Sequence, residues 1–138
     1  MELKKLTDYE PPPRRYVPAY AGNRDASEPF AVLHRPLIRA YQLEVLDLQA
    51  SLEEQKPEDG AGPEALRRYA EAADNALVAY HRRVLEGHIS GVDGLTSGGD
   101  PVGVDEFISI AIGIGPLVEE LVAAIRDAGT LSEDDSKN

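Results

Sequence analysis

Hydrophobic residues recur at intervals of three and four along two long stretches of the chain, as one face of a helix requires. The first stretch, Pro36 to Gln55, has its apolar positions at Leu37, Ile38, Tyr41, Val45, Leu48 and Leu52. The second, Pro63 to Glu86, has them at Leu66, Tyr69, Ala73, Ala76, Leu77, Tyr80 and Val84. Proline suits a first helical turn, and the run KPEDGAG (56–62) between the stretches favours a loop. The pattern predicts two amphipathic helices, the second followed by a left-handed cap at Gly87.

The C-terminal third is very apolar and predicts two more helices. One begins near Val104, with Phe107, Ile108, Ala111 and Ile112 as its buried positions. The sequence GIGP (113–116) then predicts a sharp break. A last helix begins at Pro116, carries its stripe at Leu117, Val118, Leu121, Val122 and Ile125, and is expected to end at Gly129. The polar residues after it are expected to fray.

The segments that could form β-strands are short. The apolar run Phe30 to Leu33 fits one strand or the lead-in to a helix, and we favour a short strand. The glycine-rich segment HISGVDGLTSGGDPVG (88–103) predicts a loop, with room for a short extended pair around residues 90–95. Residues 1–28 carry four prolines among charges and tyrosines, so we expect a polyproline-like extended arm without a helix.

These elements define the expected fold class. We predict a mostly α protein, a small helical domain of three to four helices with at most a short β-hairpin or strand, and extended termini. The chain divides into an extended Pro-rich N-terminal arm (1–28), a helical domain (29–129) and an acidic flexible tail (130–138). At 138 residues a single core is feasible.

The net charge limits the classes of molecule that the protein is expected to bind. With 25 acidic and 14 basic residues the net charge is −11, which repels nucleic-acid phosphates and anionic membrane surfaces. It favours a partner that is basic or displays apolar helices. No cysteine is present, so neither a disulfide nor a thiolate metal site is available. The N-terminal sequence has no signal-peptide core and no window approaches the ~18 apolar residues of a membrane span, so we expect a cytosolic protein.

The motifs of common active sites are missing from the sequence. The three histidines are too dispersed for a metal triad to be expected, and aligning Gly98 with the glycine of an EF-hand puts Leu95 and Val104 at ligand positions. Neither a phosphate-binding loop nor a nucleophile motif occurs. Adjacent carboxylates such as Glu119 and Glu120 point in different directions on a helix. We therefore expect no catalytic, metal or cofactor-binding residues, and no enzymatic activity.

The apolar C-terminal helices suggest a binding role instead. A small acidic helical body with such a pair is suited to hold a partner helix in a groove. The candidate residues, partner-facing or core-forming, are Phe107, Ile108, Ile112, Leu117, Leu121 and Ile125.

The order of several segments carries a family resemblance. The segments are FAVLHRPL (30–37), a helical middle, VLEGHISGVDGL (84–95), GGDPVGVDEF (98–107) and the closing LSEDDSKN (131–138). In this order the chain resembles the tail assembly chaperones of long-tailed bacteriophages, over residues 29–138 and without the Pro-rich arm.

The resemblance implies a non-enzymatic protein that binds the tape measure protein in the host cytoplasm while the tail assembles. It also implies that a longer form can arise by ribosomal frameshifting. The alternative is a structural virion component, a tail connector or completion protein whose extended arms pack between subunits. A nucleic-acid mimic is disfavoured because the acidic residues are interleaved with arginines. A homo-oligomer remains open.

Overall fold

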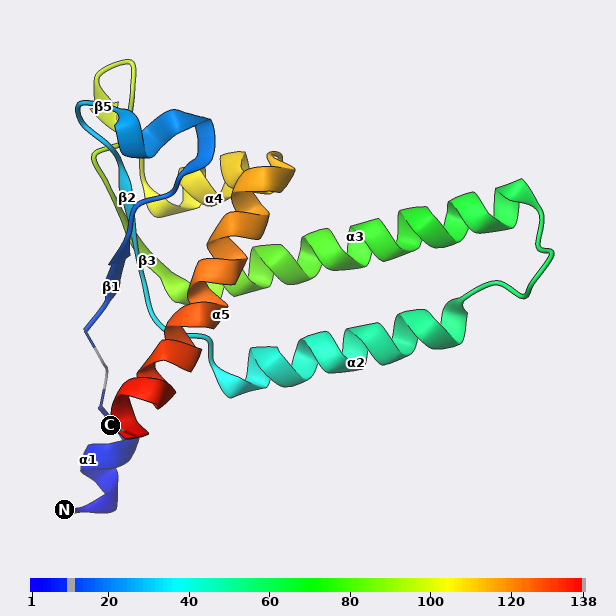
Figure 1. Cartoon of the computed structure of the whole chain (residues 1–138), viewed down its shortest axis with the longest axis horizontal. Helices are drawn as coiled ribbons and strands as arrows, with labels where there is room; N and C mark the ends of the chain where they lie inside the picture. The colour runs from blue at the N-terminus through cyan, green and yellow to red at the C-terminus, as the bar shows by residue number, and fades with distance from the viewer. Residues whose placement is uncertain (10–11, 138) are drawn as a thin grey trace.

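The computed structural model of the chain describes residues 1–9 and 12–137, with side chains described as far as Ala128. Its helices are α1 (Leu3–Thr7), the 3-10 helix η1 (Tyr20–Asp25), α2 (Arg39–Gln55), α3 (Pro63–His88), α4 (Val104–Ile112) and α5 (Gly115–Lys137). Its strands are β1 (Arg14–Tyr16), β2 (Ala31–His34), β3 (Ile89–Asp93), β4 (Thr96–Ser97) and β5 (Asp100–Pro101). A body of sheet and helices carries a long projecting hairpin made of α2 and α3 (Figure 1).

The prediction of a mostly α fold with at most one short hairpin or strand is wrong. The described chain is an α+β fold with a three-stranded antiparallel sheet, order β1-β2-β3, and a two-stranded β4-β5 hairpin. Its strands span only two to five residues, too few for an alternating pattern to show in the sequence. Their pairing joins distant positions, with Tyr16 opposite Val32 and Val32 opposite Val92. The strand favoured from the run 30–33 is confirmed as β2.

The expectation of extended termini is also wrong. Residues 1–28 contain α1, β1 and η1. Helix α1 ends before the prolines begin, so the prolines do not prevent it. At the other end, α5 continues through Gly129 to Lys137. The predicted acidic tail, 130–138, coincides with these last turns and Asn138, where side chains lie outside the described part of the chain.

The four long predicted helices are confirmed, with shifted ends. Helix α2 begins at Arg39 rather than Pro36, because the connection from β2 is still extended at Ile38 and the Leu37 amide donates to the Ile125 carbonyl of α5. Helix α3 runs on to His88 and passes directly into β3. The expected cap at Gly87 is therefore wrong, since Gly87 lies inside α3. The predicted break at 113–116 is confirmed between α4 and α5, which bend by 119°.

The core lies where α4, α5 and the inner end of α3 pack on one face of the three-stranded sheet. Its buried members are Val32, Tyr80, Val84, Leu85, Ile89, Val102, Phe107, Ile108, Ala111, Leu117, Val118, Leu121 and Ile125. The Phe30 and Phe107 rings meet edge to face with centroids 6.0 Å apart. Among the described residues no single helix is long and apolar enough to cross a membrane. The α4–α5 pair taken together meets these criteria of length and composition, but it is sharply bent.

Candidate partner-binding surface

The six residues predicted to be partner-facing or core-forming lie in the core of the body. Phe107, Ile108, Leu117, Leu121 and Ile125 are each at most 4 % exposed. The sixth, Ile112, is partly buried and packs against the same cluster. The structure thus brings all six together, but as the packing between α4, α5 and the sheet. Their strong hydrophobic pattern reflects the chain's own folding, and any partner surface has to be sought on other elements.

The projecting hairpin is the candidate. Helix α3 spans 26 residues, roughly 39 Å at ~1.5 Å per residue, and its outer half extends beyond the body (Figure 1). Helix α2 contains no buried residue. It packs on α3 through the half-buried Tyr41, Val45 and Leu48, which belong to its predicted apolar face.

Hydrogen bonds hold the two helices of the hairpin together along their length. Near the tip, the Tyr69 hydroxyl donates to the Leu52 carbonyl over 2.8 Å. Nearer the body, the Tyr80 hydroxyl donates to the Tyr41 carbonyl over 3.1 Å. In the same region Arg83 forms an ion pair with Glu44, Nε to Oε1 being 2.6 Å. The hairpin is therefore a defined element that presents fixed outer faces.

His88 fixes the root of the hairpin. Its Nε2 accepts a hydrogen bond from the Ile38 amide over 3.0 Å, at the start of α2, so the ring proton is on Nδ1, which donates to the Val84 carbonyl over 2.6 Å. Its ring meets Tyr41 edge to face, with centroids 4.8 Å apart. Burial, assisted by the nearby Arg35 charge, lowers the pKa of His88 even though the Val84 carbonyl opposes the shift. The neutral ring thus joins α2 to α3.

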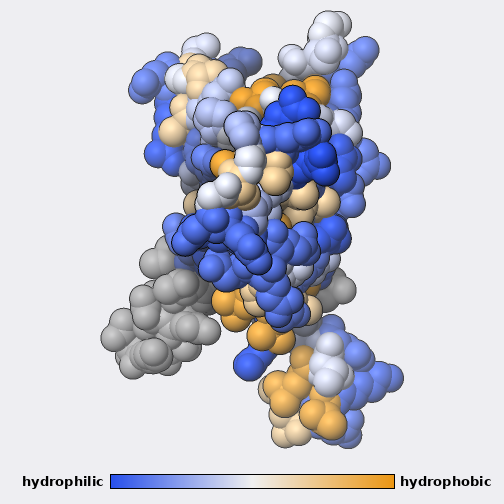
Figure 2. All heavy atoms as spheres, turned by 90° about the vertical axis from the view of Figure 1, so that its right-hand side faces the viewer, coloured by the Kyte–Doolittle hydropathy of each residue, from blue (hydrophilic) through white to orange (hydrophobic). Residues whose placement is uncertain are grey.

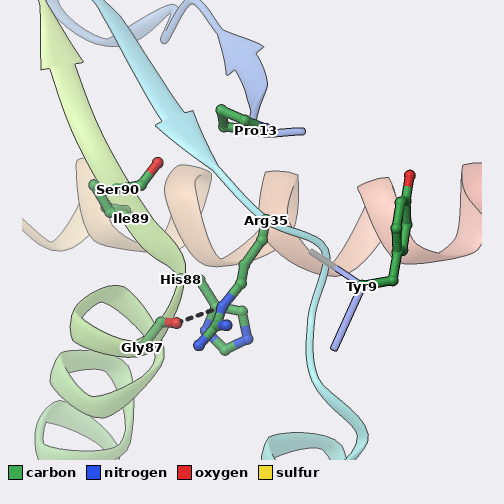
Figure 3. Close-up of a pocket in the computed structure, with 7 residues that line it drawn as sticks. All are labelled: Tyr9, Pro13, Arg35, Gly87, His88, Ile89 and Ser90. Atoms are coloured by element: carbon green, nitrogen blue, oxygen red, sulfur yellow. Dashed lines mark hydrogen bonds between the residues drawn. The ribbon is translucent and has the colours of Figure 1, made fainter. Parts of the chain in front are cut away.

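Arg35 and Gly87 complete this joint. The Arg35 Nε donates to the Gly87 carbonyl over 2.8 Å, and the Arg35 amide donates to the His88 carbonyl over 3.0 Å. A side chain on Gly87 would place its Cβ 2.5 Å from the Tyr41 hydroxyl oxygen, so any larger residue at this position would displace the Tyr41 side chain of α2. A cavity of about 380 Å³ opens beside the joint, between Arg35, Ser90 and the N-terminal Tyr9 and Pro13 (Figure 3). Both His88 ring nitrogens are engaged in the joint, so neither is available to Ser90 as a base.

The hydrogen bonds of neutral His88 at the root of the hairpin predict a loss of stability in mild acid. The unfolded chain takes up a proton on this histidine near the ordinary imidazole pKa of 6.5, whereas the folded chain resists protonation because its pKa is lowered. Stability is therefore fully present above pH 6.5 and declines as the pH falls below it. Urea unfolding at pH 7 and at pH 5 should show a lower midpoint at pH 5. His88→Gln, which cannot be protonated, should show a shallower decline; equal declines in both proteins would contradict the assignment.

Two apolar faces remain uncovered on the hairpin. On α3, Leu66, Ala70 and Leu77 are exposed on one side of the helix, and we call them the α3 ridge. On α2, Leu43 and Leu46 are 49 % and 58 % exposed on the side turned away from α3. In Figure 2, which faces the hairpin tip, hydrophobic side chains gather in separate patches on a largely hydrophilic surface. Exposed apolar side chains grouped on one element are a mark of an interaction surface.

The sequence pattern placed Leu66 and Leu77 on the apolar face of the second long helix, but it did not single out Ala70, Leu43 or Leu46. Leu66 and Leu77 continue the spacing of Tyr80 and Val84, so their pattern alone does not show where the body ends. The signal for Leu43 and Leu46 was available, because they form a second apolar set on a helix whose first set was already assigned. A helix that is apolar on two sides needs two partners.

The rest of the described surface offers few side chains suited to catalysis or metal binding. A second cavity of about 360 Å³ lies between β1 and α5, lined by Arg14, Arg15, Glu120 and Asp127 among others. His34 also lines this cavity, and burial lowers the pKa of its imidazole. Within residues 1–9 and 12–128, no group of three or more His, Asp or Glu side chains gathers as metal ligands would.

Comparison of the chain with known proteins gives no positive assignment. No family model matches the sequence, and no curated protein or solved structure matches it significantly.

Proposed function

We propose that this protein is a tail assembly chaperone that holds an apolar helical segment of a tape measure protein against the α3 ridge, without catalysis. The observation that supports the proposal most is the continuity of one helix face. Leu66, Ala70, Ala73 and Leu77 precede Tyr80, Val84 and His88 at intervals of three and four, so they lie on the same side of α3. The inner part of this face is buried in the body, and Leu66 on the outer part is 51 % exposed.

A partner helix would extend the packing that α4 and α5 already provide. The buried end of α3 contacts α4 and α5, so an apolar helix laid on the ridge would occupy the equivalent side about one to four turns further out. Such recognition needs apolar anchors at spacings of three and four on the partner. The net charge of −11 favours a partner with basic flanks. Long helical tape measure segments with exposed apolar faces need this kind of shielding before the tail tube covers them.

The test is co-expression with the tape measure protein from the same locus, followed by pull-down. The double variant Leu66→Asp, Leu77→Asp places two charges on the ridge, and both side chains are exposed enough for the fold to persist. Loss of two central apolar anchors costs about 2 kcal/mol or more, roughly a thirtyfold loss of affinity. We expect the wild-type chain to keep the partner soluble and to co-purify with it, and the variant to do neither.

The matched control is Ala72→Asp, Asn75→Asp, which adds the same charge to exposed positions of α3 away from the ridge. It should bind like the wild type. If control and ridge variants lose binding equally, added charge rather than the ridge is responsible and the assignment of the site fails. If the wild-type chain changes neither solubility nor co-purification, the chaperone function fails. Stoichiometric copies of the chain in finished particles would instead favour the structural virion component.

A further inference from the structure

The outward side of α2 carries a regular pattern. Arg39, Leu43, Leu46, Ala50 and Glu53 follow one another at intervals of four, three, four and three residues, with Glu54 beside the last. This is the spacing at which two helices pack side by side in a coiled coil. We call these residues the α2 stripe. All of them are exposed.

The α2 stripe is separate from the contact with α3. Tyr41, Val45 and Leu48, which pack toward α3, lie on the opposite side of the helix from Leu43 and Leu46. The stripe is separate from the α3 ridge as well, because the ridge belongs to the other helix of the hairpin. An occupant of the α2 stripe would therefore leave both the hairpin and the proposed tape measure surface intact.

The two ends of the α2 stripe carry charges of opposite sign. Arg39 stands at the root end, and Glu53 and Glu54 stand at the tip end of the helix. The last turn of α2 contains no basic residue and is followed by Lys56 at the C-cap, so Glu53 and Glu54 lie at the negative end of the helix dipole. An occupant that brings a positive charge to the tip end and a negative charge to the root end would be favoured at both.

A second copy of the same stripe, turned end for end, meets both requirements. We propose that the protein forms a two-fold symmetric dimer in which the α2 helices pack antiparallel through this stripe. In this register Leu43 lies beside Leu46 of the second copy, and Leu46 beside its Leu43. Arg39 then lies over Ala50 of the second copy, with Glu53 and Glu54 of that copy within one turn. The two hairpins together form a four-helix arrangement with the α2 helices at its centre.

Self-complementarity favours this occupant over an unrelated helix. The central pair of leucines and the opposite charges at the two ends are all supplied by one surface, as a two-fold interface requires. A parallel second copy would bring Arg39 against Arg39 and glutamate against glutamate, which repel. The antiparallel arrangement is therefore the one that the charges select.

Disulfide trapping tests the register directly, because the chain contains no cysteine. Chains carrying Leu43→Cys and chains carrying Leu46→Cys are purified separately, mixed and oxidised. We expect mixed disulfides to dominate over disulfides between identical chains, since the register pairs position 43 with position 46. Ala72→Cys, on an exposed position of α3, reports random collision and should cross-link little. Cross-linking of the mixed pair no greater than that of the control would overturn the proposal.

Sedimentation equilibrium supplies the second readout. The wild-type chain should have twice the mass of the 15.0 kDa monomer, and Leu46→Asp should be monomeric with an unchanged circular dichroism spectrum. Arg39→Glu alone and the Glu53→Arg, Glu54→Arg double variant should each raise the dissociation constant about tenfold, since attraction becomes repulsion at both ends. Combining the three changes should restore the dimer. A wild-type monomer at all concentrations, or no recovery on combination, would refute the antiparallel α2 interface.

These outcomes are independent of the chaperone test. The ridge variant Leu66→Asp, Leu77→Asp should dimerise like the wild type, because its substitutions lie on α3. Leu46→Asp should still bind a tape measure segment through each ridge. Failure of the dimer with retained partner binding would count against the α2 interface alone, and the reverse result would count against the proposed function alone.

Discussion

Phe107→Ala is expected to lower the free energy of unfolding by about 3–5 kcal/mol, the loss usual for a buried phenylalanine. Phe107 is 2 % exposed and packs edge to face on Phe30, so truncation leaves a cavity between α4 and the strand segment. A loss of this size is a large fraction of the stability of a domain this small. Urea unfolding followed by circular dichroism should show a lower midpoint with an unchanged slope.

Ile110→Ala is the matched control on the same helix. Ile110 is 50 % exposed, and its truncation should change the free energy of unfolding by no more than about 0.5 kcal/mol. The contrast separates two roles for the C-terminal apolar residues. If Phe107→Ala were as mild as Ile110→Ala while abolishing partner binding, Phe107 would face a partner and the assignment of α4 to the core would be wrong.

Glu120→Ala is expected to release the N-terminal segment and to cost about 2–4 kcal/mol, since hydrogen bonds to a charged group contribute ~1.5–3 kcal/mol each and this site is partly solvated. The Glu120 carboxylate accepts hydrogen bonds from the Tyr16 hydroxyl over 2.6 Å, the Ala19 amide over 2.7 Å and the Tyr20 amide over 3.0 Å. These bonds tie β1 and η1 to α5. Trypsin should cleave the variant after Arg14, Arg15 or Arg24 several times faster than the wild type.

Protonation of Glu120 should have the same effect. Burial opposes ionisation, but the Tyr16 hydroxyl and the two amides outweigh it and lower the carboxyl pKa. The anchor's contribution is therefore present above the ordinary glutamate pKa of 4.5 and is lost as the pH falls through the lower folded value. Burial and the same carboxylate raise the pKa of Tyr16 to about 12, so its hydroxyl remains a donor. Glu119→Ala, on the exposed neighbouring position, should leave trypsin cleavage unchanged; equal acceleration would contradict the anchor.

The long helices could be predicted from the sequence because each carries many turns of a regular apolar pattern. Helix α3 is the clearest case, where seven apolar positions, mostly three or four residues apart, indicate the helix and Pro63 marks its first residue. Proline and glycine indicated the α4–α5 break for the same local reason. What could be predicted was set by interactions within one element.

The small strands and the role of the N-terminal residues depend on distant contacts. The pairing of Arg14 with His34 and the bonds from residues 16, 19 and 20 to Glu120 join positions that no local pattern connects. An extended free arm was therefore the natural prediction for 1–28, although the structure holds its second half against the body. Three prolines before Arg14 concealed the strand that follows them.

The sequence left open whether the six C-terminal residues face a partner or form the core, for a physical reason. Hydrophobic spacing marks a face that leaves water, and it does not say whether the face packs on the same chain or on another. The six C-terminal residues and Leu66 and Leu77 give the same kind of signal, but the first set packs between α4, α5 and the sheet, while Leu66 and Leu77 lie where α3 has left the body. The distinction depends on the length of α3 relative to its neighbours.

In the proposed function, the projecting half of α3, and not the α4–α5 pair, receives a partner. Hydrogen–deuterium exchange of the free chain and of its co-expressed complex with the tape measure protein tests this most directly. We predict slower amide exchange on binding over residues 64–80, with little change over residues 107–125, whose apolar side chains pack in the core in both states. Protection confined to residues 107–125, with the hairpin exchanging equally in both states, would contradict it.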